Sequence, residues 1–372
     1  MKQAVIKNGA ARNYLIDALR FIAICFVVYI HIFEINGGVK FSDTSTSWKF
    51  IDVLFGAARI AVPLFFAISG WFIFSKDRGE QIKKLQRQIP NLIKILITAT
   101  IVINIVIFLF LKLHIMQGVF AFSPQVKGLF EMFILGKSPT VGTLWFLATL
   151  IIVQGIYWLV SRKEKNDKWL LIAAVSFFSL NLAFGAYRNI TGFPEIPFPI
   201  NETWFVGFAW FSLGYFLAKY FKDSPELIKT KSLVTFTLTA AALYLYEYIL
   251  HTSGSPFSFG PYNYHAIFIF TPLITAGILL LAARSTKDSP FVRKLAFLGK
   301  NYALGVFIIH ILVMQVINAV FSRYLLLEDM PLIKLVVTYT LVAGLSFALT
   351  ALYYVVKAKI SQTVSKLPVN KS

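Results

Sequence analysis

The chain has 372 residues, of which 57% are hydrophobic and only 14% are charged, and its mean hydropathy is +0.70. Soluble domains carry about 25% charged residues, so this composition excludes an ordinary soluble domain. The net charge of +19 would suit a nucleic-acid-binding protein, but the distribution of that charge along the chain argues against this function.

Long apolar runs divide the chain into ten expected membrane spans. A run of about 20 apolar residues crosses a bilayer as a helix. The runs are continuous rather than alternating with period two, which favours helices over a β-barrel. We therefore predict an all-α, polytopic integral membrane protein. Its expected spans cover residues 14–35, 50–74, 90–112, 142–160, 169–187, 203–219, 232–250, 264–283, 302–322 and 334–356.

The basic residues are concentrated in the loops expected on one side of the membrane. Most of the 36 Lys and Arg residues fall in segments on the same side as the N-terminus, which is the pattern of cytoplasmic loops. Ten spans then place both termini in the cytoplasm. We expect a cytoplasmic segment at 1–13, a single transmembrane domain at 14–356 and a basic cytoplasmic tail at 357–372.

This topology explains the basic surplus without nucleic acid. Basic residues on the cytoplasmic side orient the chain and add affinity for the anionic head groups of membrane lipids. We therefore expect membrane lipids as partners and no nucleic acid. The expected location is a cell membrane, with the bacterial cytoplasmic membrane favoured.

The first expected span carries four ionisable residues on one face, namely Asp17, Arg20, His31 and Glu34. At about 100° per residue they fall in a stripe roughly 100° wide, and Arg20 and His31 are about 16 Å apart along the helix axis. An ionisable group at bilayer depth costs at least ~2.5 kcal/mol, so such residues usually face a protein interior or a watery cavity and have a function. We expect the chemistry on this face.

The second expected span contains Arg59 within its apolar length, and Pro63 breaks the helix hydrogen bonding just beyond it. Two interpretations of Arg59 stay open. It pairs with an acidic residue, for which Asp17, Glu34 and Asp52 are the candidates. Alternatively, it binds an anionic donor or stabilises a developing oxyanion.

The inner loop before the third span has an amphipathic pattern. Lys83, Lys84 and Arg87 have helical spacing beside apolar residues, which predicts a helix lying in the membrane interface. This segment either anchors the protein to lipid or holds the phosphates of a cytoplasmic cofactor.

Other polar and aromatic residues mark the later spans. His310 lies about eight residues into the ninth span, where a histidine is either satisfied by a neighbouring carbonyl or takes part in catalysis. Trp145 opens the fourth span and Tyr302 opens the ninth. The hydroxyls of Ser69 and Tyr302 are candidates for a covalent acyl relay. Five scattered histidines and a single cysteine predict no metal site.

Five short motifs in chain order resemble those of the membrane acyltransferase-3 family. The match runs from about residue 12 to residue 315, and the order and topology of the motifs agree with the family. The first motif is Arg20 followed, after ten intervening residues, by His31, and Asp17-Ala-Leu precedes the arginine. The other four motifs are the segments 59–71, 144–147, 210–215 and 298–310.

The resemblance implies that the chain moves an acyl group, usually acetyl from acetyl-CoA, onto extracytoplasmic or lipid-linked acceptors such as cell-envelope glycans. No fused extracytoplasmic hydrolase-like domain is expected. Acyl-CoA is then a substrate, and no resident cofactor is expected. The alternative function is that of a transporter or flippase without transfer chemistry. A third possibility is a membrane protein whose buried charges only stabilise helix packing. The protein could also form a homo-oligomer.

The residues fit acyl transfer as follows. His31 is the natural general base at neutral pH, and Glu34 could orient its imidazole. Arg20, nearer the cytoplasm, could bind the phosphates of CoA, because a guanidinium suits bidentate contacts with phosphate. Asp17 either positions Arg20 or simply neutralises it. Acetyl-CoA binding by Lys83, Lys84 and Arg87 and catalysis by Arg59 complete the predicted site.

Overall fold

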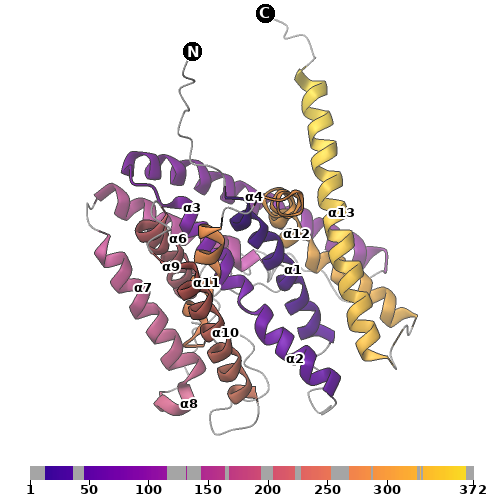
Figure 1. Cartoon of the computed structure of the whole chain (residues 1–372). Coiled ribbons are helices and arrows are strands. Elements are labelled where there is room, and N and C mark those ends of the chain that lie inside the picture. The colour runs from indigo at the N-terminus through magenta and orange to yellow at the C-terminus, as the bar shows by residue number, and fades with distance from the viewer. Residues whose placement is uncertain are drawn as a thin grey trace, which may run out of the picture.

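The computed structural model describes a helical protein (Figure 1), and no strand occurs in the part of the chain that it describes. The described residues are 13–36, 46–114, 131, 144–163, 167–193, 204–222, 228–252, 268–285, 288–324, 327 and 330–365.

Each of the ten expected spans contains a helix. The helices are, in chain order, α1 (Tyr14–Asn36), α2 (Thr46–Ala58), α3 (Ala61–Ile73), α4 (Arg78–Lys112), α6 (Trp145–Lys163), α7 (Lys168–Asn181), the π-helical turn η3 (Leu182–Ala186), α8 (Arg188–Thr191), α9 (Trp204–Phe221), α10 (Thr230–Thr252), α11 (Thr271–Arg284), α12 (Pro290–Arg323) and α13 (Pro331–Ser365).

Eight helical segments among the described residues are long and apolar enough to cross a membrane. This confirms an all-α, polytopic membrane protein. Helices α2 and α3 together make one of the eight, Lys49–Ile73. The two other expected spans coincide with α9, which has 18 residues, and α11, which has 14. The count of ten spans remains a prediction.

Three helices, α4, α12 and α13, extend beyond their expected spans by nine residues or more. Helix α4 runs unbroken from Arg78 to Lys112 with Pro90 inside it, so the expected interfacial helix and third span are one element. Helix α12 begins at Pro290 rather than at 302, and α13 continues to Ser365, past the expected end at 356. Hydropathy detects only the apolar part of a helix, whereas polar flanking turns continue to the next capping residue.

Capping residues account for two of these earlier starts. The Asp77 side chain accepts a hydrogen bond from the Gly79 backbone N–H at 2.8 Å and begins α4. The Ser289 side chain accepts one from the Val292 backbone N–H at 3.2 Å, with proline in the first helical position of α12. Both patterns are typical helix starts.

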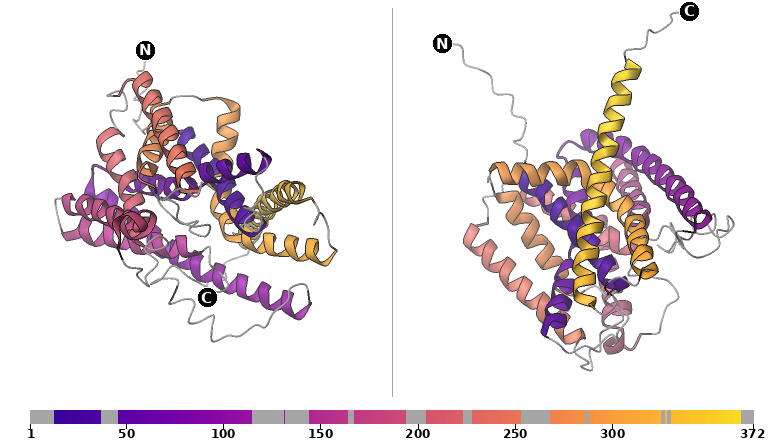
Figure 2. Two further views of the ribbon diagram at one scale, coloured as in Figure 1. Left: turned by 90° about the horizontal axis from the view of Figure 1, so that it is seen from below. Right: turned by 90° about the vertical axis from the view of Figure 1, so that its right-hand side faces the viewer.

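Helix α1 begins and α13 ends toward the same end of the molecule, and the last turns of α13 extend beyond the other helices (Figures 1 and 2). An even number of crossings would give this arrangement. The Asn13 side chain, just before α1, donates hydrogen bonds to the carbonyls of Ala282 and Ala283 at 2.8 and 2.9 Å. These contacts fix the start of α1 to the end of α11.

Glycines allow the closest helix pairs to approach. A Cβ atom on Gly299 of α12 would collide with the backbone carbonyl of Asp17 on α1. The pair α3 and α9 shows the same feature twice, since a Cβ on Gly70 would meet the carbonyl of Phe211 and a Cβ on Gly214 that of Ala67. Small residues permit such packing between membrane helices. Helix α1 is thereby held closely against α12.

Candidate active site

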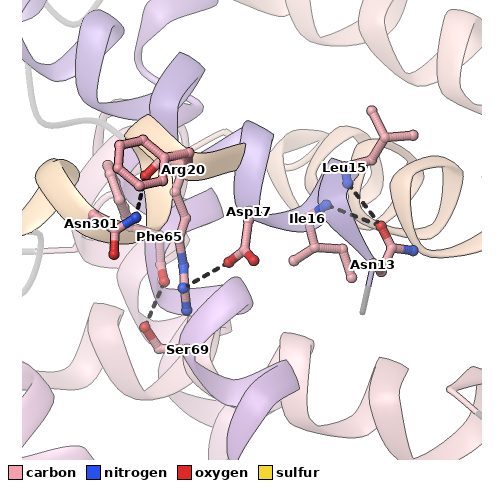
Figure 3. Close-up of polar contacts among 9 residues, drawn as sticks. Asn13, Leu15, Ile16, Asp17, Arg20, Phe65, Ser69 and Asn301 are labelled. Atoms are coloured by element: carbon pink, nitrogen blue, oxygen red, sulfur yellow. Dashed lines mark hydrogen bonds and ion pairs between the residues drawn. The ribbon is translucent and has the colours of Figure 1, made fainter. Parts of the chain in front are cut away.

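One end of the charged face of α1 is the ion pair of Asp17 and Arg20, in which the carboxylate is buried and the arginine side chain is 27% exposed. A guanidinium nitrogen of Arg20 lies 3.1 Å from a carboxylate oxygen of Asp17, and Asp17 is only 4% exposed. The guanidinium carbon of Arg20 lies 4.6 Å from the centre of the Phe72 ring on α3. Figure 3 shows the Arg20 side chain reaching between Asp17 and Ser69. The two predicted roles of Asp17, neutralising and positioning Arg20, are both compatible with this geometry.

The other end of the face is a half-buried pair of His31 and Glu34. The Nδ1 atom of His31 lies 3.4 Å from a carboxylate oxygen of Glu34, and the two side chains are 27% and 22% exposed. A carboxylate accepts hydrogen bonds, so this contact favours the proton on Nδ1 and leaves the lone pair on Nε2. The His31 imidazole is therefore oriented in the way that a general base requires.

The structure brings His310 of α12 against His31. The centres of the two imidazole rings are 5.3 Å apart, with an angle of 34° between the ring planes. His310 is fully buried, whereas His31 is partly exposed. The sequence suggested each histidine separately and gave no sign that they meet.

A row of aromatic side chains leads from Trp145 to His310. Trp145 lies 6.2 Å from Phe66, and Phe66 lies 4.4 Å from Phe146, measured between ring centres. Phe146 then lies 5.2 Å from Phe307, and Phe307 lies 6.0 Å from His310. This packed row connects Trp145 with the histidine pair.

Arg59 lies at the break between α2 and α3. Pro63 cannot donate a backbone hydrogen bond to the carbonyl of Arg59, which is four residues earlier, and this accounts for the break. Arg59 interacts electrostatically with Asp52, and its guanidinium lies 5.4 Å from the centre of the Phe268 ring. The Tyr248 hydroxyl donates to Asp52 at 2.8 Å. These contacts favour pairing of Arg59 with Asp52 among the acids considered.

The basic residues predicted to bind phosphate, Lys83, Lys84 and Arg87, lie on the first turns of α4. Lys83 and Arg87 are exposed, and Lys84 pairs with Glu80 of the same helix at 3.3 Å. On the opposite side, Gln81 is buried and donates to the Ser161 hydroxyl of α6 at 2.8 Å. The segment is thus fixed against the helix bundle, with its basic side chains outward.

The two candidate relay hydroxyls lie in ordinary structural surroundings. The Ser69 hydroxyl donates to the carbonyl of Phe65 at 2.9 Å, the local hydrogen bond that serines often make within helices. The Tyr302 ring packs against Phe297 at 5.6 Å and against Tyr354 of α13 at 5.8 Å. Neither arrangement activates a hydroxyl.

The sequence gave no indication of two further features. Phe72 supports Arg20, but nothing distinguishes it from the other 36 phenylalanines in the sequence. Glu247 is buried and accepts hydrogen bonds from the backbone N–H groups of Ile269 and Phe270 at 2.9 and 3.2 Å, which caps the start of α11. In the part of the chain that the structure describes, no group of three or more His, Cys, Asp or Glu could hold a metal ion.

Comparison with known proteins agrees with this organisation. The acyltransferase domain family Acyl_transf_3 matches residues 13–355. An amino-acid racemase of Enterococcus faecalis is 25% identical over 226 residues, which are 59% of this chain and 29% of the racemase, so the chain spans less than a third of that relative. No solved structure matches the chain. Because the family match covers nearly the whole chain and its helices are those of a polytopic membrane protein, the protein belongs to the membrane acyltransferase-3 family.

Proposed function

We propose that this membrane acyltransferase moves an acetyl group from acetyl-CoA to a hydroxyl of an extracytoplasmic or lipid-linked glycan. The observation that carries the proposal is the His31–Glu34 pair, with Nδ1 of His31 3.4 Å from the carboxylate. This pair lies on the same helix as an arginine that could hold the donor. Its partial exposure gives a substrate access to the imidazole.

The proposed reaction is a direct transfer. Nε2 of His31 takes the proton of the acceptor hydroxyl, and the hydroxyl oxygen attacks the carbonyl carbon of the thioester. The carbon–sulfur bond then breaks, and the CoA thiolate takes up the proton from His31. Glu34 holds the imidazole in the required tautomer and stabilises the imidazolium, as the carboxylate of a catalytic triad does.

Arg20 is the proposed contact for the phosphates of CoA. The guanidinium is already oriented by Asp17 and by the Phe72 ring, and a planar guanidinium binds phosphate oxygens in pairs. Arg20 and His31 are about 16 Å apart along α1. This separation is comparable with the length of a pantetheine arm, so one CoA could contact both residues. The Asp17 carboxylate would then act as a positioning group.

The remaining predicted residues have supporting parts in this proposal. Lys83, Lys84 and Arg87 would attract acyl-CoA or anionic lipid toward the cytoplasmic side, where the basic bias of the loops places them. Trp145 and the aromatic row would separate the reacting groups from water. Arg59, beside Asp52, would stabilise the second span rather than the transition state.

The proposal is tested with purified protein in nanodiscs supplied with labelled acetyl-CoA and an extract of envelope glycans. We expect acceptor-dependent release of CoA, with label on the glycan, that is lost in His31→Ala. The matched control is His114→Ala, which removes an exposed histidine at the end of α4. No turnover by folded wild-type protein would contradict the proposal and favour a carrier without transfer chemistry.

A further inference from the structure

His310 is anchored to the backbone of its own helix. Its Nδ1 atom lies 3.1 Å from the carbonyl oxygen of Val306 and 2.8 Å from that of Phe307. Carbonyl oxygens only accept hydrogen bonds, so Nδ1 carries the proton. The neutral imidazole then has its lone pair on Nε2. Two backbone contacts therefore fix the tautomer of a buried histidine.

The Nε2 atom of His310 is a buried acceptor without a hydrogen-bond partner among the described residues. His310 is also 0% exposed, so bulk water does not serve as its partner. A buried polar atom left unsatisfied costs about 1–3 kcal/mol, and such atoms in native proteins call for an explanation. Since Nδ1 faces the backbone of α12, Nε2 lies on the side of the ring away from that backbone.

His31 is the ionisable neighbour of this ring, at a centre-to-centre distance of 5.3 Å. Phe307, whose ring centre lies 6.0 Å from that of His310, is apolar and offers no proton. His31 is partly exposed and His310 is not. A substrate can therefore reach His31 directly, whereas the fully buried His310 lies behind it.

We propose that His310 is a positioning residue for His31, and that its Nε2 lone pair stabilises the imidazolium that His31 becomes during acyl transfer. This inference rests on the proposed function of His31 as general base. Glu34 and His310 would then hold one imidazole from two helices. Close packing of α1 on α12 at Gly299 keeps the two histidines in register.

The proton balance of the step is simple. When the acceptor hydroxyl loses its proton to His31 and its oxygen attacks the thioester carbon, His31 carries a positive charge. The lone pair of His310 faces that charge, and it takes up no proton itself. When the carbon–sulfur bond breaks, the CoA thiolate accepts the proton from His31, and both histidines return to their neutral forms.

Two conservative variants separate this role from a structural one. His310→Asn keeps a donor near the position of Nδ1 and loses the acceptor, whereas His310→Gln places its terminal oxygen or nitrogen near the position of Nε2. We expect His310→Asn to lower kcat about 10- to 100-fold, the effect of one hydrogen bond to a charged group, with little change in KM for acetyl-CoA. We expect His310→Gln to recover a substantial part of that loss.

A purely structural role predicts the reverse order, because Asn preserves the bonds to Val306 and Phe307. Activity of His310→Asn equal to or above that of His310→Gln would overturn the inference. When His31→Ala is already present, adding His310→Asn should not change the remaining rate. If His310→Asn lowers the rate of the His31→Ala protein as much as it lowers that of wild type, the inference is also overturned. If wild type itself releases no CoA, the proposed function fails and this inference falls with it; if wild type turns over, the order of the two variants tests this inference alone.

A measurement on the unaltered His310 covers the case in which neither variant folds. In protein labelled with ¹⁵N-histidine, His31→Ala should shift the Nε2 signal of His310, because the neighbouring imidazole is removed. An unchanged Nε2 signal would show that the two rings do not interact and would overturn the inference.

Discussion

The two ends of the charged face of α1 differ in how firmly they are held. Asp17 is 4% exposed and lies 3.1 Å from Arg20, which also packs on Phe72. His31 and Glu34 are 27% and 22% exposed and lie 3.4 Å apart. Arg20 is itself 27% exposed, as His31 is, so the two ends differ mainly in their carboxylates: that of Asp17 is buried and that of Glu34 is partly exposed.

This difference suggests a division of labour. A partly exposed guanidinium that a buried carboxylate and an aromatic ring already orient is suited to hold a donor in one position, because little side-chain entropy is lost when it binds. A half-exposed imidazole beside a carboxylate is suited to move protons. We therefore assign binding of the acyl donor to the Arg20 end and proton transfer to the His31 end. Substitutions at the Arg20 end should change KM, and substitutions at the His31 end should change kcat.

The largest expected effect is that of His31→Ala. Removal of a general base lowers kcat by about 10²- to 10⁴-fold, and KM for acetyl-CoA should change little. Steady-state kinetics in nanodiscs measures both constants, with thermal unfolding as the check on folding. A variant that keeps its kcat would rule out His31 as the base.

Substitutions at the Arg20 end of α1 should instead raise KM for acetyl-CoA. Removing Arg20 alone would take a positive charge away from the buried Asp17 carboxylate, which is destabilising. We therefore prefer the neutral pair Asp17→Asn with Arg20→Gln, and expect KM for acetyl-CoA to rise about 10- to 100-fold with kcat largely kept.

The control for the neutral pair is Arg162→Gln, which removes an arginine that packs on Trp158 at 4.9 Å. It should leave KM within about twofold of wild type, a change below the effect of one charged hydrogen bond. A neutral pair with unchanged KM would remove Arg20 from donor binding.

A smaller effect is expected from Gly299→Ala, which tests how firmly α1 is held. The added Cβ collides with the Asp17 carbonyl, and such overpacking costs about 1–3 kcal/mol of stability. Gly155→Ala is the matched control, since its Cβ would meet nothing within 4 Å and alanine favours helix. In thermal unfolding, Gly299→Ala should melt at a lower temperature than Gly155→Ala. Equal melting temperatures would contradict the described α1–α12 contact.

The smallest expected effect is that of Ser69→Ala. The hydroxyl is engaged with the Phe65 carbonyl, so turnover should stay within about twofold of wild type, since loss of a local helix hydrogen bond is a minor change. Loss of acyl transfer in a folded Ser69→Ala protein would instead indicate a covalent relay at this residue.

Much of the fold and part of the site could be predicted from the sequence. Helical periodicity placed Asp17 with Arg20 and His31 with Glu34, because residues three apart on one helix are neighbours. The helix ends were less well predicted, since hydropathy does not detect the polar turns that begin α4 and α12 or end α13.

Contacts between distant segments could not be predicted in this way. Arg59 had three candidate partners, and only the folded chain shows it interacting with Asp52 and lying over the Phe268 ring. The meeting of His31 with His310 depends on the register of α1 against α12, whose backbones approach closely at Asp17 and Gly299. A single sequence carries no signal for such a register.

Equilibrium binding of acetyl-CoA to two variants tests the central claim most directly. We expect His31→Ala to bind acetyl-CoA about as tightly as wild type, whereas the neutral pair at Asp17 and Arg20 should bind it about 10- to 100-fold more weakly. Loss of binding in His31→Ala together with retained binding in the neutral pair would contradict the division between a donor-binding end and a chemical end of α1.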